Sequence, residues 1–302
     1  MDNQITYAYL ETTNHCNFNC SFCNRDEVVD KLSHMPIPKF KTLLEKIKDE
    51  PISEVKLMGM GEPFLHPKFD EICQLFRETF PKAKIITSTN CSYKIIPQLI
   101  KSLKYIDVLY LSIDGYRKTY EEHRPPARWS KLISFLNKFK SMDRHDCKVV
   151  INYVVTPSNV GSIQPVYDEI LIPYKLEELR LNFAQNWTEN EIMVGGYTKS
   201  QIEYLKNTWS DNIMGKSKWD YNDCFWPDNG LYMTVNGDLK MCCLNTGTDS
   251  FGNIFDNTID EIKQTKRYQE IKDGCKTNNP TEHCVNCSYK ELVPLLLKTK
   301  ND

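Results

Sequence analysis

The 302-residue chain lacks a long apolar run, a signal peptide and an excess of either charge. No stretch approaches the roughly 20 apolar residues that span a bilayer, and the N-terminus has no apolar signal core. A formal charge of −2 gives no global field for nucleic acid. Internal repeats and low-complexity linkers are also missing. These absences predict a cytoplasmic globular protein that binds neither nucleic acid nor membrane.

Cysteine, by contrast, is abundant, with 12 residues. A disulfide framework is disfavoured, because a reducing compartment is expected and the chain is long enough to bury its own core. Isolated residues such as Cys73 and Cys147 are typical of buried thiols. The remainder cluster toward the two ends of the sequence, a distribution that indicates metal ligands.

Short apolar runs alternate with amphipathic segments over the first 185 residues, a pattern that predicts parallel β/α units. After residue 185 the pattern changes to a polar connector, and Asn236-Gly237 then predicts a β-hairpin turn. The predicted strands are 5–11, 54–59, 84–89, 108–113, 148–155 and 178–183, and the predicted helices are 37–49, 67–80, 94–104, 129–142 and about 160–172.

Three cysteines, Cys16, Cys20 and Cys23, lie within the stretch "TTNHCNFNCSFCNR" directly after the first predicted strand. A structural zinc site needs four ligands, and His15 or His66 could supply the fourth. Three thiolates also suit an iron–sulfur cube. One iron is then left without a protein ligand, and an open metal position is where cofactor or substrate chemistry takes place.

This C-x3-C-x2-C spacing, with Phe22 before the last cysteine, resembles the signature of the radical SAM superfamily. The resemblance implies an α/β fold, a partial (β/α)6 TIM-like barrel. It also implies that S-adenosylmethionine (SAM) chelates the open iron of a [4Fe–4S] cluster. Reductive cleavage of SAM then yields a 5′-deoxyadenosyl radical that abstracts a hydrogen atom from substrate. A reducing donor such as flavodoxin or ferredoxin is implied as a partner.

Further motifs follow in register behind the cysteines. The segment "MGMGEP" (58–63) is similar to the GGEP motif of the family, although Met60 replaces a usual glycine. In the family such a turn meets the SAM ammonium through its backbone, and the glutamate braces it. The resemblance implies SAM contacts from the following residues: Phe22, Gly59, Met60, Gly61, Glu62, Ser88, Asn90, Ser112, Asp114, Arg124 and Asn152.

A second cysteine set has the spacing C-x17-C…C-x2-C. Four thiolates can form a zinc ribbon. The surrounding sequence also resembles the SPASM, or twitch, extension of radical SAM enzymes, which implies an auxiliary [4Fe–4S] cluster. Its ligands would be Cys224, Cys242, Cys284 and Cys287, with Cys243 and Cys275 left as alternates or buried thiols. We predict a radical SAM core at 1–185, a connector at 186–222 and a small Cys-rich α+β twitch/SPASM-like domain at 223–302.

The resemblance favours a radical SAM oxidoreductase that dehydrogenates a small polar metabolite and passes an electron to the auxiliary cluster. A peptide-modifying enzyme, either an epimerase or a thioether-forming maturase, is the alternative. Cys91 follows "STN" (88–90), where the family usually has glycine, and a thiol there could return a hydrogen atom to substrate as an epimerase requires. A zinc-stabilised scaffold without chemistry is a third hypothesis.

Overall fold

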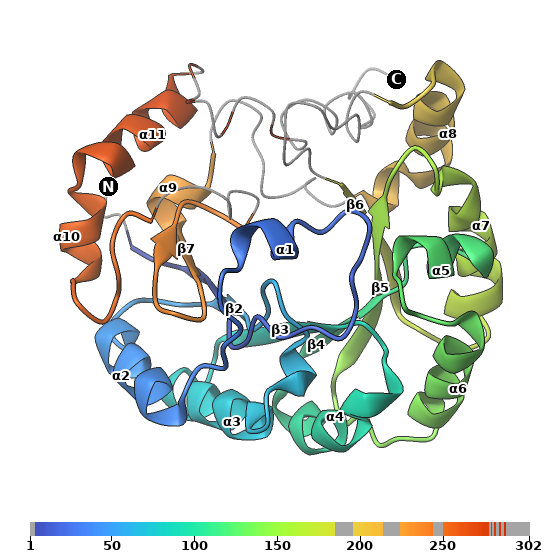
Figure 1. The fold of residues 1–302 in the computed structure, drawn as a ribbon, viewed down its shortest axis with the longest axis horizontal. Coiled ribbons are helices and arrows are strands. Elements are labelled where there is room, and N and C mark those ends of the chain that lie inside the picture. The colour runs from blue at the N-terminus through green and yellow to red at the C-terminus, as the bar shows by residue number, and fades with distance from the viewer. Residues whose placement is uncertain are drawn as a thin grey trace.

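A computed structural model describes residues 4–184, 196–213, 224–243 and 250–277, with residues 279, 281, 284 and 287. Its strands form a single sheet in the order β6-β5-β4-β3-β2-β1-β7-β8 (Figure 1). Every neighbouring pair is parallel except β7 and β8. The strands are β1 (Tyr7–Leu10), β2 (Glu54–Lys56), β3 (Lys84–Thr89), β4 (Val108–Ser112), β5 (Lys148–Val155), β6 (Glu178–Phe183), β7 (Gly230–Met233) and β8 (Leu239–Lys240).

Helices alternate with the first six strands, which confirms the predicted β/α units. The last unit differs in detail, because a 3₁₀ turn, α7 and a π-helical turn at Tyr167–Leu171 replace one continuous helix. The helices are α1 (Arg25–Val28), α2 (Ile37–Ile47), α3 (Phe69–Thr79), α4 (Ile96–Ser102), α5 (Lys118–His123), α6 (Trp129–Lys140), α7 (Ile163–Val166), α8 (Lys199–Trp209), α9 (Trp226–Asn229), α10 (Ile259–Lys263) and α11 (Lys266–Lys276).

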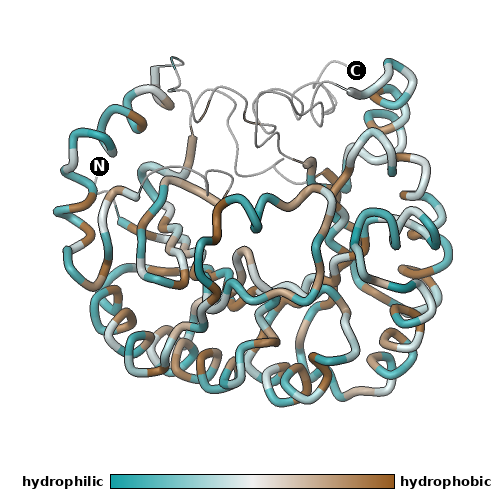
Figure 2. Tube along the Cα trace, in the orientation of Figure 1, coloured by the Kyte–Doolittle hydropathy of each residue, from teal (hydrophilic) through white to brown (hydrophobic). Residues whose placement is uncertain are grey.

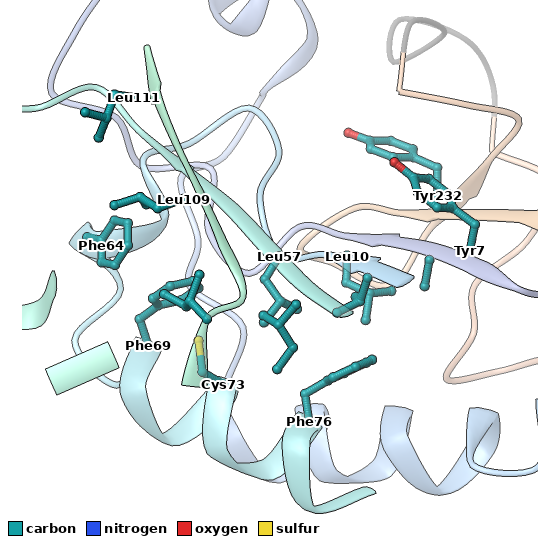
Figure 3. Packing of buried hydrophobic residues seen from close by; sticks show 14 of the residues in the cluster. Tyr7, Leu10, Leu57, Phe64, Phe69, Cys73, Phe76, Leu109, Leu111 and Tyr232 are labelled. Carbon is teal, nitrogen blue, oxygen red and sulfur yellow. The ribbon is translucent and has the colours of Figure 1, made fainter. Parts of the chain in front are cut away.

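The main core lies between the outer face of the sheet and the surrounding helices. Apolar and polar positions alternate along these helices, as expected of helices with one buried face (Figure 2). Phe69, Cys73 and Phe76 of α3 are fully buried and belong to one cluster with Leu10 and Leu57 (Figure 3). Burying each large apolar side chain contributes about 1.5–3 kcal/mol, so this layer holds the sheet in its curved form.

The inner face of the sheet carries a separate, smaller apolar cluster. It contains Met58, Ile86, Val108, Tyr110 and Val150, and Tyr9 packs against it. Tyr7 and Tyr232 also project to this side, away from α3 (Figure 3). Because side chains alternate between the faces of a strand, the polar residues in register with this cluster also face inward.

The predicted hairpin is present and turns at Gly237, whose φ is +95°. A Cβ at this glycine would lie 2.4 Å from the ring of Phe255, so both conformation and space require glycine. The sequence did not predict that β7 pairs in parallel with β1, Tyr7 opposite Gly230. The hairpin therefore extends the barrel sheet rather than standing apart from it.

The predicted connector contains a regular helix, α8, which the sequence analysis did not predict because the segment is polar. Thr198 and Gln201 form a reciprocal capping box at its start. The rest of the connector largely lies outside the described residues. In the described part of the chain, no helix is long and apolar enough to cross a membrane.

Candidate functional site

The first three cysteines lie on the loop that joins β1 to α1, at the carboxyl end of β1. This loop is held from outside by the α5 region: the Asn19 amide donates to the Pro125 carbonyl at 2.6 Å, and the Ser21 amide donates to the His123 carbonyl at 3.0 Å. From inside, the Arg25 guanidinium donates to the Phe18 carbonyl at 3.0 Å. These hydrogen bonds engage the backbone of the loop, so they do not occupy the thiol groups.

Burial raises the pKa of Cys16, Cys20 and Cys23, that of Cys20 to about 12. The charges of the other two thiols also raise the pKa of Cys20, so the three lie within electrostatic reach of one another. Thiolates here need a cation to stabilise them. Nη1 of Arg124 lies 3.7 Å from Sγ of Cys20, and a bound metal cluster would supply the rest.

A single zinc ion fits this loop poorly. His66 uses both ring nitrogens, one with the Met35 carbonyl at 2.9 Å and the other as acceptor from the Lys68 amide at 3.1 Å. His15 stacks on His34 with ring centroids 4.1 Å apart. Among the described residues, no three His, Cys, Asp or Glu side chains converge on one metal ion. An iron–sulfur cube, whose irons occupy separate corners, accepts more widely spaced thiolates.

The "MGMGEP" loop packs directly against the cysteine loop. A Cβ at Gly61 would lie 2.3 Å from the Thr13 carbonyl oxygen and 2.7 Å from that of His15, so only glycine allows this approach. The Glu62 amide donates to the His15 carbonyl at 2.8 Å. The two loops whose motifs imply cluster and SAM binding therefore pack against each other.

Two buried carboxylates position this loop. Glu62 accepts the Asn90 amide at 2.6 Å, and burial raises its pKa to about 7. Glu11, at the end of β1, accepts the Met60 amide at 2.5 Å and the Val235 amide at 3.0 Å, and burial raises its pKa to about 6. Glu62 thus links the loop after β2 to the loop after β3, and Glu11 links it to the turn after β7.

Arg124 and Asp114 form a buried ion pair, with exposures of 7% and 0% for their side chains. Asp114 also accepts the Val154 amide at 2.6 Å, and the Arg124 guanidinium lies 5.6 Å from the centroid of the Phe22 ring. Asp114 is therefore engaged by the protein itself. The predicted SAM contact of Arg124 requires its remaining N–H groups, since Nε and Nη1 are directed at Asp114 and Cys20.

The other predicted SAM contacts divide into two groups. Ser88 and Ser112 lie at the carboxyl ends of β3 and β4, and Asn152 lies within β5, opposite Ser112 in register. Asn90 instead bonds within the protein, since its side-chain amide donates to Asn17 Oδ1 at 2.8 Å and lies 3.9 Å from Cys16 Sγ. This geometry makes Asn90 a support of the cysteine loop.

Cys91 is 3% exposed and belongs to the main core cluster. Its φ of +61° explains why glycine is usual at this position. The thiol donates to the Thr89 carbonyl at 3.8 Å, and burial raises its pKa well above the ordinary value. This position does not favour a hydrogen donor to substrate, and the predicted role stays a prediction.

The second cysteine set is gathered from distant segments. Cys224 precedes α9, Cys242 follows β8, and Cys284 and Cys287 come from the tail. Hydrogen bonding with Cys275 and burial both raise the pKa of Cys224 and Cys284, and the charge of Cys242 raises the pKa of both further. Thiols that are separate in the sequence are thus neighbours in the fold.

The two cysteine sets lie at opposite ends of β1. Cys16 comes after the last residue of β1, whereas Cys224 comes before β7, whose first residue Gly230 pairs with Tyr7. Burial, and after it the charge of Cys243, raises the pKa of Tyr7, so Cys243 lies near the start of β1. The inner face of the barrel therefore separates the two sets.

Sequence reasoning missed three supporting residues: Glu11, Asn17 and Arg25. An acidic residue at the end of an apolar strand was the available signal for Glu11. Asn17 and Arg25 lie in or beside the cysteine motif, but their role is to bond the backbone and Asn90, which no spacing reveals. These residues act on the loops that hold ligands rather than on the ligands.

Comparison with known proteins identifies two domains. Residues 10–170 match the radical SAM superfamily model, and residues 224–288 match the SPASM model, an iron–sulfur cluster-binding domain. The chain is 21% identical over 315 residues to the antilisterial bacteriocin subtilosin biosynthesis protein AlbA of Bacillus subtilis (strain 168), which covers 95% of this chain and 68% of AlbA.

A second relative is the tungsten-containing aldehyde ferredoxin oxidoreductase cofactor-modifying protein of Pyrococcus furiosus. It is 27% identical over 345 residues, which cover 99% of this chain and 91% of that protein. Among solved structures, Streptococcus suis SuiB bound to precursor peptide SuiA has a TM-score of 0.69 at 18% identity, and covers 96% of this chain and 71% of SuiB.

The site fits the cofactors of this family. The loop after β1 carries three thiols, two half-buried and one exposed, beside a glycine loop, and a further set of thiols gathers from separate segments. The two domains imply SAM and two [4Fe–4S] clusters. With its barrel, its cysteine loop and more than half of its length matched, the chain belongs to the radical SAM superfamily and carries a C-terminal SPASM iron–sulfur domain.

Proposed function

We propose that this enzyme oxidises a small polar substrate held inside the barrel. The observation that carries the proposal is the location of the two cysteine sets at opposite ends of β1. A substrate on the inner face then lies between the SAM site and the auxiliary site. Removal of a hydrogen atom next to oxygen or nitrogen leaves a radical. Loss of one electron toward the auxiliary site and one proton to solvent converts it into a carbonyl or imine.

When bound, SAM and its cluster supply the hydrogen-atom abstraction, and the auxiliary cluster accepts one electron. The protein supplies position. Glu11, Glu62 and Gly61 fix the loop that we expect to meet the SAM ammonium. The predicted ligands, Cys16, Cys20 and Cys23 at one end and Cys224, Cys242, Cys284 and Cys287 at the other, are part of this proposal.

The inner face supports a polar substrate. Arg180 donates to the Tyr110 hydroxyl at 2.6 Å and pairs with Glu178 at 2.6 Å, and the Lys56 ammonium lies 5.8 Å from the Tyr9 ring centroid. The side chains of Arg180 and Glu178 are 25% and 32% exposed, so solvent reaches this part of the inner face. Their presence is consistent with an interior that binds polar groups. The near end-to-end match to a cofactor-modifying protein also supports a small molecule.

A peptide substrate is the second candidate. It is favoured by the similarity to a bacteriocin biosynthesis protein and to SuiB, whose structure contains a precursor peptide. The proposal also includes a cytoplasmic location and a flavodoxin or ferredoxin as the reductant.

To separate the two candidates, 5′-deoxyadenosine formation is measured with the small-molecule and peptide pools of a fractionated cell extract. Stimulation by the peptide pool alone would favour the second candidate.

The oxidation is tested with the double variant Cys284→Ala, Cys287→Ala. SAM cleavage should survive, because the loop after β1 is unchanged, whereas oxidised product should no longer form. The matched control Cys73→Ala, Cys147→Ala removes two buried thiols that belong to neither set and should keep both activities. Circular dichroism must show that the variant is folded, since cluster binding and folding are coupled. A folded variant that makes oxidised product at the wild-type rate would refute the proposal.

A further inference from the structure

A fifth cysteine, Cys275 of α11, lies within the auxiliary site. Its Sγ is 4.0 Å from Sγ of Cys284, and its side chain also hydrogen-bonds with Cys224. Cys275 is 1% exposed, so the thiol faces its neighbours rather than solvent. It therefore touches two of the four predicted ligands, which come from opposite ends of the domain.

The helix that carries Cys275 is fixed beside Cys224. The Tyr268 hydroxyl donates to the Pro227 carbonyl at 2.6 Å, and the Lys272 ammonium pairs with Asp228 at 2.8 Å. Both contacts join α11 to α9, the helix that begins two residues after Cys224. Because α11 is tied to α9 in this way, the distance from Cys275 to Cys224 is set by the fold.

The contact distance argues against Cys275 as a ligand. Thiolates that bind different irons of a cube occupy different corners, so they do not touch one another. A sulfur–sulfur distance of 4.0 Å is instead that of an S–H···S hydrogen bond, in which the donor keeps its proton. Four other cysteines are present to complete the ligand set of a cube.

We propose that Cys275 is a positioning residue that donates its single S–H to the ligating sulfur of Cys284 and raises the reduction potential of the auxiliary cluster. Reduction adds one negative charge to the cluster and its ligands. A hydrogen-bond donor at the ligand sulfurs stabilises this reduced state more than the oxidised state. The thiol would thus make the cluster a better electron acceptor.

This inference rests on the auxiliary cluster that the SPASM domain implies and not on the proposed oxidation. It can be tested without any substrate. The variants are Cys275→Ala, which removes the donor, and Cys275→Ser, which keeps an O–H donor of similar size. Cys73→Ala is the control, because Cys73 is a fully buried thiol of α3 outside the site. Each anaerobically reconstituted protein is analysed for iron and titrated with a reductant under electron paramagnetic resonance.

We expect about eight irons in all three variants, as in the parent protein. In Cys275→Ala, the ratio of reduced to oxidised auxiliary cluster at a fixed potential should fall about tenfold, which corresponds to 59 mV for one electron. Cys275→Ser should recover most of this loss, and Cys73→Ala should not change the ratio. Rescue by serine distinguishes a hydrogen bond from simple packing.

Two results would overturn the proposal. Loss of about half the iron in both Cys275 variants would show that Cys275 is a ligand. An unchanged midpoint potential in a Cys275→Ala protein with full iron content would show that the thiol only fills space. Neither result bears on whether a substrate is oxidised, so failure here and failure of the proposed function are distinguishable.

Discussion

The two cysteine sets are built in opposite ways. Cys16, Cys20 and Cys23 occupy a single loop of eight residues, whereas the auxiliary cysteines are spread over positions 224–287. The first loop is held by hydrogen bonds from its backbone to the end of α5 and the segment after it. The second set combines one cysteine before α9, one after β8 and two beyond α11.

The first cysteine set thus lies on a loop of an already packed domain, whereas the second set forms part of the packing of its own region. The barrel buries a large apolar cluster between its sheet and helices, which supports the first loop whether or not a ligand is bound. The region that carries the second set contains short elements, α9, α10 and the two-residue β8. We infer that ligand binding contributes more to folding there.

The largest effect is expected from the triple variant Cys16→Ala, Cys20→Ala, Cys23→Ala. SAM cleavage should be abolished and about half the iron lost, because one of the two cubes loses all its protein ligands. The far-ultraviolet circular dichroism should stay unchanged, since the barrel does not depend on this loop. Iron analysis and a 5′-deoxyadenosine assay measure the outcome. Retention of all the iron would contradict the assignment of these ligands.

Sequence reasoning recovered the barrel because each of its signals is local. The six strands and the helices between them follow from apolar periodicity, and β5 and β6 match the predicted ranges residue for residue. The hairpin at Gly237 follows from its turn chemistry. The parallel pairing of β7 with β1 could not be predicted from local sequence patterns, because it joins residues more than 200 positions apart.

The site shows the same division. Motif spacing identified the cysteine loop and the "MGMGEP" turn, which pack together. It did not reveal that Asp114 holds Arg124, or that Asn90 bonds to Asn17. A sequence states which residue types are present. These pairings depend instead on the curvature of the sheet and on which side chains it brings within hydrogen-bonding distance.

An intermediate effect is expected from Arg124→Ala, which probes the buried support of the first set. The change leaves Asp114 buried without its cation, which should cost about 3–5 kcal/mol of unfolding free energy. SAM affinity should fall about tenfold or more if Arg124 also meets the SAM carboxylate. The matched control is Arg128→Ala. Its exposed pair with Glu121, 3.7 Å apart, should be worth about 1 kcal/mol or less.

Chemical denaturation and SAM titration distinguish these two contributions. A stability loss with unchanged SAM affinity would make Arg124 purely structural. Equal destabilisation by Arg124→Ala and Arg128→Ala would contradict the importance of burial.

The smallest effect concerns Glu11, which joins the two regions. Its folded pKa of about 6 lies above the ordinary value of 4.5, so the folded state holds the proton more tightly. The corresponding stability is present below pH 4.5 and is lost as the pH rises to about 6, which amounts to about 2 kcal/mol. Glu11→Gln cannot titrate and should lack this slope. Urea unfolding at several pH values compares the two proteins, and parallel pH profiles would rule the effect out.

The open barrel leaves the sheet with two outer strands, and exposed strand edges attract other chains. At one edge, β6 is bridged by Ile213, which pairs with Leu181 in parallel. At the other edge, β8 is two residues long and offers little backbone to a second molecule. The hairpin that brings Cys242 to the auxiliary site therefore also shields the edge of β1, so a variant that releases it should aggregate.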